Sequence, residues 1–300
     1  WDTDMDLLLA RVIDGFNNGL IYGFLGLALV IVFRGTGQVN MAQGEMAMFS
    51  AFTAYAFVAA GLPIVVAIAL AVLVGVISGG LIERVLIRPL GHGAHNSVLL
   101  VTIGLFLAIN SAAGVIWGGD PLTLPAVVPD GPDDYLPVFG ARLRYQQLVL
   151  LIVLLLVLAV IFALFRYTKV GLAMRAAASN PESARLAGMR VDRINGLGWM
   201  MAGGVGALLG TLIAPSTSLT TGMMFNFLIY AIAAATLGGF DSPGGAVLAG
   251  LLLGIVENLL ASYVEFVGPD LKQAVGLVVL MGVLMVRPTG LFGTKKVERV

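Results

Sequence analysis

Three carboxylates stand inside long apolar stretches of this 300-residue chain, and they are its first candidates for chemistry. They are Asp14, Glu45 and Glu257. A lone charge in the hydrocarbon of a bilayer costs about 3 kcal/mol or more, so each side chain is expected to face protein or water. Buried acids of this kind line solute or ion pathways, or they form hydrogen bonds between helices. Both interpretations stay open for each residue.

Amide side chains accompany these acids. Asn18 follows Asp14 by one helical turn, and Asn258 directly follows Glu257, so each pair gives an apolar helix a polar face. Glu45 lies near a predicted helix start, where the helix dipole offsets part of the cost of its charge.

A glycine pattern occurs twice, 201 residues apart. Its two copies are Gly37-x-x-Asn40-x-x-x-Gly44 and Gly238-x-x-Asp241-x-x-x-Gly245. The repetition hints at a duplicated half, because transporters often place interrupted helices of two repeats beside the pathway. Two unrelated tight turns, each needing glycine and a capping Asn or Asp, explain it as well. The candidate pathway residues are Asn18, Asn40, Gly44, Glu45, Asp241, Glu257 and Asn258.

Enzyme and metal motifs are missing. The two histidines, His92 and His95, stand in "GHGAHN" without an acidic neighbour or a third ligand, and the chain has no cysteine. The phosphate-binding pattern G-x-x-x-x-G-K-[ST] does not occur, nor does a G-x-S-x-G or S-x-x-K nucleophile context. We therefore expect no catalytic residue, no metal site and no cofactor bound by this chain.

Composition indicates the elements that position these residues. The chain is 59% hydrophobic and 11% charged, against about 25% charged in soluble domains, and its apolar runs approach the ~20 residues of a membrane-spanning helix. The runs are continuous rather than alternating, which favours an all-α membrane fold with about 8–9 transmembrane helices. The predicted spans are 8–33, 44–60, 63–82, 97–117, 146–165, 195–214, 225–240, 244–264 and 272–286. The second and seventh are the weakest, and either could be re-entrant.

Basic residues predict the orientation. The segments 34–43, 83–96, 166–194, 241–243 and the C-terminus hold 13 of the 17 basic residues, which places them in the cytoplasm. Acidic residues gather in the N-terminal segment and in the 118–145 loop, which are expected outside. Arg11, Arg142, Arg144 and Lys272 depart from this pattern. The N-terminus is therefore predicted outside and the C-terminus inside.

The longest cytoplasmic loop, 166–194, carries its own helix signals. Asn180 suits an N-cap, Pro181 the first helical position, and Glu182 the positive end of the helix dipole. Gly188 suits a left-handed stop, which predicts a short helix over 181–187. Asp192 could cap the next helix. The exposed faces of the short helix mix small residues with leucine and arginine, namely Ala184, Ala187, Leu186, Arg185 and Arg190. This mixture suits insertion into a groove of a soluble partner; a basic loop that sets topology and touches lipid headgroups is the alternative.

Three segments in order resemble one family. They are "YTKVGLAMRAAASNPESARLAGMRVDRI", "GQVNMAQGEMAMFSAF" and "ATLGGFDSPGGAVLAGLLLGIVENLL". The second matches an Asn-x-Ala-x-Gly turn of the family at Asn40, Ala42 and Gly44. The chain thus resembles, from about 20 to 290, the LivH/LivM-type permeases of ABC importers for branched-chain amino acids.

The resemblance implies one permease domain over 1–300, multi-pass in the bacterial cytoplasmic (inner) membrane, with 166–194 as its coupling loop and 118–145 as its outer loop. In that family the loop helix couples to an ATPase subunit, which implies this role for Arg175, Asn180, Pro181, Glu182, Ala184, Arg185, Leu186 and Gly188. The implied partners are two ATPase subunits that carry ATP and magnesium, a sister or identical permease, and an extracytoplasmic solute-binding protein, besides membrane lipid; nucleic acid is not among them.

Two functions of other classes stay open. An ion-coupled secondary carrier or channel would act without an ATPase and would need a proton or sodium site such as Glu45 or Glu257. A membrane scaffold would have no pathway. The substrate itself is open beyond branched-chain amino acids, related amino acids or amides.

Overall fold

The computed structural model describes residues 2–91, 95–131, 133–138, 141–264, 271–286 and 290–291. The predictions for His92 and for the basic residues Arg287, Lys295, Lys296 and Arg299 lie outside the described residues, and so do the side chains of His95, Asp2, Asp4, Asp6 and Lys272.

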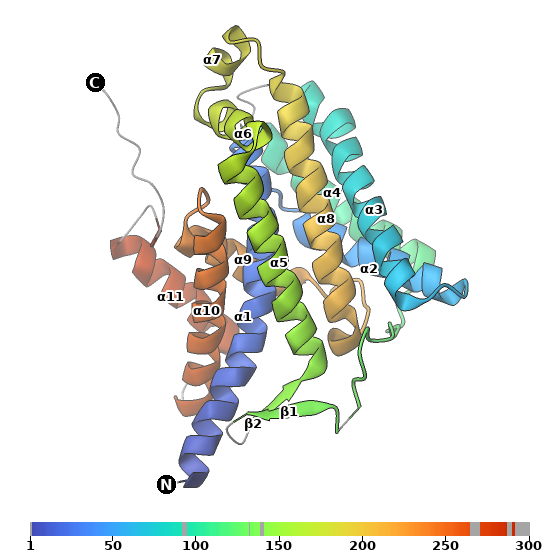
Figure 1. Ribbon diagram of the computed structural model, residues 1–300, viewed down its shortest axis with the longest axis vertical. Coiled ribbons are helices and arrows are strands. Elements are labelled where there is room, and N and C mark those ends of the chain that lie inside the picture. The colour runs from blue at the N-terminus through green and yellow to red at the C-terminus, as the bar shows by residue number, and fades with distance from the viewer. Residues whose placement is uncertain are drawn as a thin grey trace.

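Helices make up most of the described chain, as the sequence predicts (Figure 1). The α-helices are α1 (Asp2–Thr36), α2 (Gln43–Ala59), α3 (Ile64–Ile82), α4 (His95–Trp117), α5 (Tyr145–Tyr167), α6 (Lys169–Ser179), α7 (Pro181–Leu186), α8 (Val191–Thr217), α9 (Phe225–Gly238), α10 (Pro243–Tyr263) and α11 (Lys272–Val286). A π-helix, η1 (Glu83–Ile87), and a 3-10 turn, η2 (Arg88–Leu90), continue α3. Strands β1 (Tyr135–Val138) and β2 (Ala141–Arg144) form an antiparallel hairpin in the 118–145 segment, which the sequence analysis treated as a loop.

Six helical segments in the described residues are long and apolar enough to cross a membrane. They are Leu7–Thr36, Ile64–Leu90, Asn96–Trp117, Tyr145–Tyr167, Val191–Thr217 and Pro243–Tyr263. Each of the nine predicted spans coincides with a helix, but α2, α9 and α11 have 17, 14 and 15 residues, fewer than the ~20 that a span requires. The count of eight to nine membrane-crossing helices stays a prediction.

Glycines let the central helices approach one another at backbone distance. Gly19 of α1 faces α10 so closely that a Cβ on it would lie 2.7 Å from the Leu251 Cα. Gly203 of α8 lies against Gly75 of α3 in the same way, and Gly210 lies against the Ala47 backbone of α2. Small residues at such spacing are typical of helix packing in membranes. These glycines therefore serve close packing between helices.

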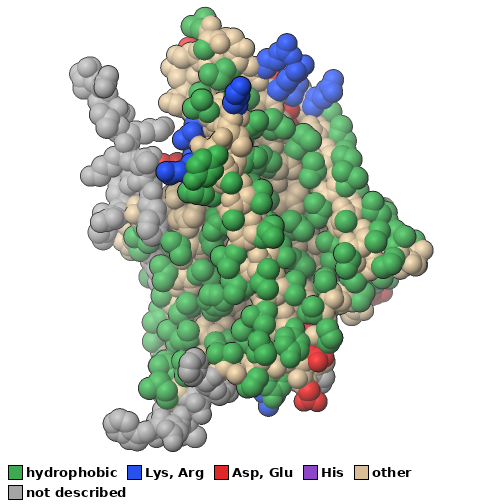
Figure 2. Space-filling view, in the orientation of Figure 1, with side chains coloured by type: hydrophobic (Ala, Val, Ile, Leu, Met, Phe, Trp, Pro, Cys, Tyr) green, Lys and Arg blue, Asp and Glu red, His purple; other side chains and the backbone are tan. Residues whose placement is uncertain are grey.

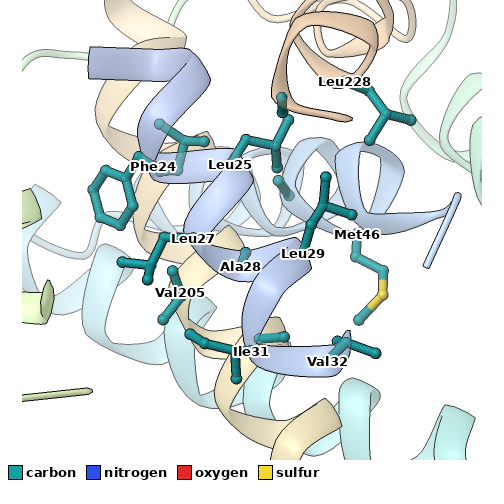
Figure 3. Packing of buried hydrophobic residues seen from close by; sticks show 14 of the residues in the cluster. Phe24, Leu25, Leu27, Ala28, Leu29, Ile31, Val32, Met46, Val205 and Leu228 are labelled. Carbon is teal, nitrogen blue, oxygen red and sulfur yellow. The ribbon is translucent and has the colours of Figure 1, made fainter. Parts of the chain in front are cut away.

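Helix α1 forms the centre of the core. Its apolar residues Leu25, Leu29 and Val32 are completely buried, and Val205 of α8, Met46 of α2 and Leu228 of α9 lie around the same helix in Figure 3. By contrast, α4 and α5 expose much of their apolar surface. These outer helices form an apolar outer surface of the described chain.

Charged side chains lie at opposite ends of the molecule. Figure 2 shows lysine and arginine gathered around α6, α7 and the start of α8, while acidic side chains appear near the hairpin and apolar side chains cover the surface between. Arg144 is an exception, since its guanidinium lies 3.7 Å from the Asp130 carboxylate at the hairpin end. The two ends are called below the α7 end and the hairpin end.

Candidate functional site

The short helix α7 begins as its sequence predicts. The Asn180 side chain accepts a hydrogen bond from the Ser183 amide at 2.9 Å, and Pro181 occupies the first helical turn. Gly188 follows the helix with φ +82°, a left-handed conformation that favours glycine. The helix ends at Leu186, one residue earlier than predicted.

The segment before α7, predicted only as part of the 166–194 loop, is a second helix, α6. Thr168 caps α6 by accepting a hydrogen bond from the Gly171 amide at 3.1 Å. Met174 and Ala177 of α6 are buried, so α6 packs against the membrane helices and holds α7 in place. The pair of helices, rather than α7 alone, forms the projecting element at the α7 end (Figure 1).

Two predictions for this element are wrong. Ala184 is buried, not exposed, so the exposed surface of α7 consists of other residues, with Leu186 90% exposed. Asp192 does not cap α8, whose N-cap position is Arg190. Instead, the Asp192 carboxylate accepts a hydrogen bond from the Arg185 guanidinium at 3.1 Å, and this ion pair ties α7 to the start of α8.

A polar chain continues from this ion pair to η1. The Arg88 guanidinium donates to the Asp192 backbone oxygen at 3.4 Å and to the Glu83 carboxylate at 2.6 Å. Glu83 is buried, and a Cβ on Gly196 of α8 would lie 3.2 Å from its Oε2 atom. The contacts connect α7, α8 and the π-helix after α3, a type of helix that is frequent at functional sites.

A polar turn precedes α2. Asn40 accepts a hydrogen bond from the Ala42 amide at 3.0 Å and donates one to the Gln43 side chain at 3.1 Å. Gln43 in turn donates to the Ala202 backbone oxygen of α8 at 2.9 Å. Gly44 is buried against Met224. The predicted Asn40 and Gly44 therefore lie in one turn that fixes the start of α2 to α8.

Glu45 has a partner that the sequence did not reveal. Asn110 of α4 donates to the Glu45 carboxylate at 3.0 Å and to the Thr221 backbone oxygen at 2.7 Å. Glu45 is completely buried, and its other carboxylate oxygen has no hydrogen-bond partner among the described residues. No local sequence signal singles out Asn110 within the apolar helix α4, because its role depends on a contact 65 residues away.

The other two predicted acids, Glu257 and Asp14, lie away from Glu45. The Tyr22 hydroxyl donates to Glu257 at 3.0 Å, and Asn258 donates to the Arg11 backbone oxygen at 2.6 Å. Both contacts join α1 to α10, which is the interhelical alternative of the sequence analysis. Asp14 is exposed and Asn18 is half-buried. The predicted pathway residues are thus distributed over separate helix pairs rather than gathered in one cluster.

The two glycine patterns fold differently. Asn40 supports the turn before α2, whereas Ser242, not Asp241, caps α10 by accepting a hydrogen bond from the Gly245 amide at 3.1 Å. Asp241 instead lines a cavity of about 660 Å³ at the α7 end, together with residues of α1, η1, α6 and α8. The expectation that an Asn or Asp caps the helix in both copies is wrong.

The chain matches one family model over most of its length. A family model described as the permease component of the branched-chain amino acid transport system matches residues 11–285. The high-affinity branched-chain amino acid transport system permease protein LivH of Escherichia coli is 29% identical over 97% of this chain and 97% of its own length. BraD of Pseudomonas aeruginosa, described in the same words, is 27% identical over 97% of this chain and 98% of its own length. A structure of PsaBC from Streptococcus pneumoniae in complex with Fab covers 94% of this chain and 92% of that one at 13% identity and a TM-score of 0.48.

Proposed function

The chain belongs to the family of branched-chain amino acid transport system permease components, and we propose that it is the membrane-spanning subunit of an ATP-driven importer. Its substrates are branched-chain amino acids or related amino acids and amides. The chain is a multi-pass protein of the cytoplasmic (inner) membrane. The observation that carries the proposal is the family match over 11–285.

ATP hydrolysis is assigned to separate subunits. The chain has no G-x-x-x-x-G-K-[ST] motif for binding phosphate. We therefore assign the binding of ATP and magnesium to two partner ATPase subunits. Helix α7 is the coupling element, a role supported by its projection from the α7 end and by the exposure of Leu186. A second permease, identical or a sister chain, and an extracytoplasmic solute-binding protein complete the importer. The N-terminus lies outside, the C-terminus inside, and eight to nine helices cross the membrane.

Movement of α7 reaches the membrane helices through α8 and η1. The Arg185–Asp192 ion pair joins α7 to α8, and Arg88 joins η1 to α8 through Glu83 and the Asp192 backbone oxygen. Gly203 packs α8 directly on α3. Because such closely packed helices move together, closure of the ATPase pair would shift α3 and α8 as one body. We place the solute pathway beside the polar turn at Asn40, which is joined to α8 through Gln43, and the Glu45–Asn110 contact.

Affinity purification in mild detergent, followed by an ATPase assay, tests this proposal. Leu186→Glu places a charge on the exposed tip of α7 and should abolish co-purification of the ATPase subunits. Leu136→Glu is the matched control, since Leu136 is an exposed leucine of the hairpin at the other end, and it should retain them. If both variants retain the ATPase subunits equally, α7 is not the coupling element.

The alternative is an ion-coupled carrier or channel, which the buried Glu45 favours. A chain that purifies alone and moves leucine in vesicles without ATP would establish it. Glu45→Gln should then abolish the dependence on an ion gradient. Under the importer proposal, the same vesicles require ATP and the solute-binding protein.

A further inference from the structure

The cavity at the α7 end is large enough for a small molecule. Its volume is about 660 Å³, within the range of about 300–1,000 Å³ that is common for ligand pockets. Its walls come from the end of α1, from η1, from α6 and from the start of α8, with Pro181 of α7 at its edge. A ligand there would touch the elements that join α7 to the membrane helices.

Charges of both signs line this cavity in equal number. Among its described lining residues, the cations are Arg34, Arg88 and Arg175, and the anions are Glu83, Asp192 and Asp241. Glu83 is held by Arg88 and Asp192 by Arg185. A lining that carries both signs of charge can pair with both ends of a zwitterionic ligand, whereas an anion such as phosphate would pair with the arginines alone.

One side of the cavity is preorganised for a carboxylate. The Arg34 guanidinium lies over the Phe165 ring at 4.3 Å from its centroid, which fixes its plane. Arg175 of α6 lines the same cavity as Arg34 of α1, so two cations from separate helices face one ligand-sized space. Two neighbouring guanidinium groups repel each other, and a carboxylate between them removes that repulsion through charge-assisted hydrogen bonds.

The remaining groups suit an ammonium and an aliphatic side chain. Asp241 contributes a carboxylate to the lining, and the Asn195 side-chain oxygen is buried without a hydrogen-bond partner among the described residues. Both residues line the cavity and can accept hydrogen bonds from an ammonium. Phe33, Ile87 and Val191 supply apolar wall.

We propose that this cavity binds the free amino acid from the cytoplasm as a zwitterion, with its carboxylate on Arg34 and Arg175 and its ammonium on Asp241 and Asn195. The identity of the ligand rests on the proposed function, since the imported amino acid is the zwitterion with an aliphatic side chain that reaches this end. Its binding would hold α1, η1, α6 and α8 together beside α7 and so slow further transport.

Isothermal titration of the purified permease complex, free of solute-binding protein, tests the site. The probes are L-leucine, 4-methylpentanoate, which lacks the ammonium, and 3-methylbutylamine, which lacks the carboxylate. We expect leucine to bind and each analogue to bind at least ~10-fold weaker, because each leaves one set of charged groups unpaired. Equal affinity for 4-methylpentanoate and leucine, or no leucine binding at millimolar concentration, would overturn the proposal.

Variants locate the binding. Arg34→Gln should weaken leucine binding at least ~10-fold, while Arg190→Gln, an exposed arginine near α7 that does not line the cavity, should leave it unchanged. Ala178→Trp keeps every charge but fills the cavity from α6, and it should abolish binding even if Arg34→Gln fails to fold. Unchanged affinity in a folded Ala178→Trp complex would refute this location.

The two proposals fail separately. A complex that imports leucine with ATP and the solute-binding protein, but does not bind leucine at this cavity, refutes only the cavity proposal. A complex that shows no ATP-driven uptake of any branched-chain amino acid refutes the proposed function, and the titration then shows whether the cavity still selects zwitterions.

Discussion

Arg88 connects a buried carboxylate to the start of α8, and its replacement gives a test at the level of single residues. Glu83 is 2% exposed, and Arg88 is its partner at 2.6 Å. Arg88 itself is 36% exposed, but its removal leaves the buried Glu83 carboxylate without compensation, whereas removing both side chains also removes that charge. The cost of losing Arg88 is therefore mainly the desolvation of Glu83.

We expect Arg88→Leu to destabilise the protein by about 3 kcal/mol, and the double variant Glu83→Leu/Arg88→Leu to be more stable than Arg88→Leu alone. Thermal unfolding of the purified proteins in the same detergent ranks the variants by stability. Additive losses in the double variant would show that Glu83 is hydrated or otherwise compensated when Arg88 is absent.

Glu45 permits a second test at this scale. Its carboxylate is held by Asn110, while its other oxygen has no partner among the described residues. Glu45→Gln keeps the shape of the side chain and removes its charge, so folding should persist. If the acid faces the solute pathway, initial leucine uptake in vesicles should fall at least ~10-fold at an unchanged amount of assembled complex. Uptake equal to wild type would assign Glu45 to structure alone.

At the scale of elements, the sequence predicts where helices form better than it predicts which residues make contacts between them. Continuous apolar runs predict α3, α4 and α5, and Asn180 with Pro181 predicts the start of α7, because these signals are local. The partners Asn110 of Glu45 and Arg185 of Asp192 could not be predicted, since each depends on how separate helices pack. The amphipathic helix α6 was missed because its apolar face, with Met174 and Ala177, is short and lies among basic residues.

Close packing of α3 on α8 leads to a prediction at the scale of elements. Gly203 lies directly against the Gly75 carbonyl oxygen, so Gly203→Val should force the two helices apart and destabilise the fold by about 1–3 kcal/mol or more. Gly104→Val on α4 is the matched control, because a Cβ there meets nothing within 4 Å. The fraction of monodisperse protein in size-exclusion chromatography reports the difference. Similar fractions for the two variants would contradict backbone contact between α3 and α8.

At the scale of the whole molecule, the separation of charge between the two ends predicts that the α7 end faces the cytoplasm. Arginines gather at the α7 end, and acidic residues gather near the hairpin (Figure 2). Basic segments are retained in the cytoplasm during insertion, so both the coupling role of α7 and the cavity proposal require this orientation. An inverted protein would present α7 and the cavity to the outside, where no ATPase could bind.

The chain has no cysteine, so single cysteines can be labelled without further changes. Leu186→Cys on α7 should react with a membrane-impermeant maleimide only after the cells are opened, while Leu136→Cys on the hairpin should react in intact spheroplasts. Both side chains are exposed in this chain, at 90% and 41%, and labelling of the detergent-purified permease without its ATPase subunits is the control that separates the side of the membrane from cover by a partner. Labelling of Leu186→Cys in intact spheroplasts would invert the orientation and exclude α7 as the contact to a cytoplasmic ATPase.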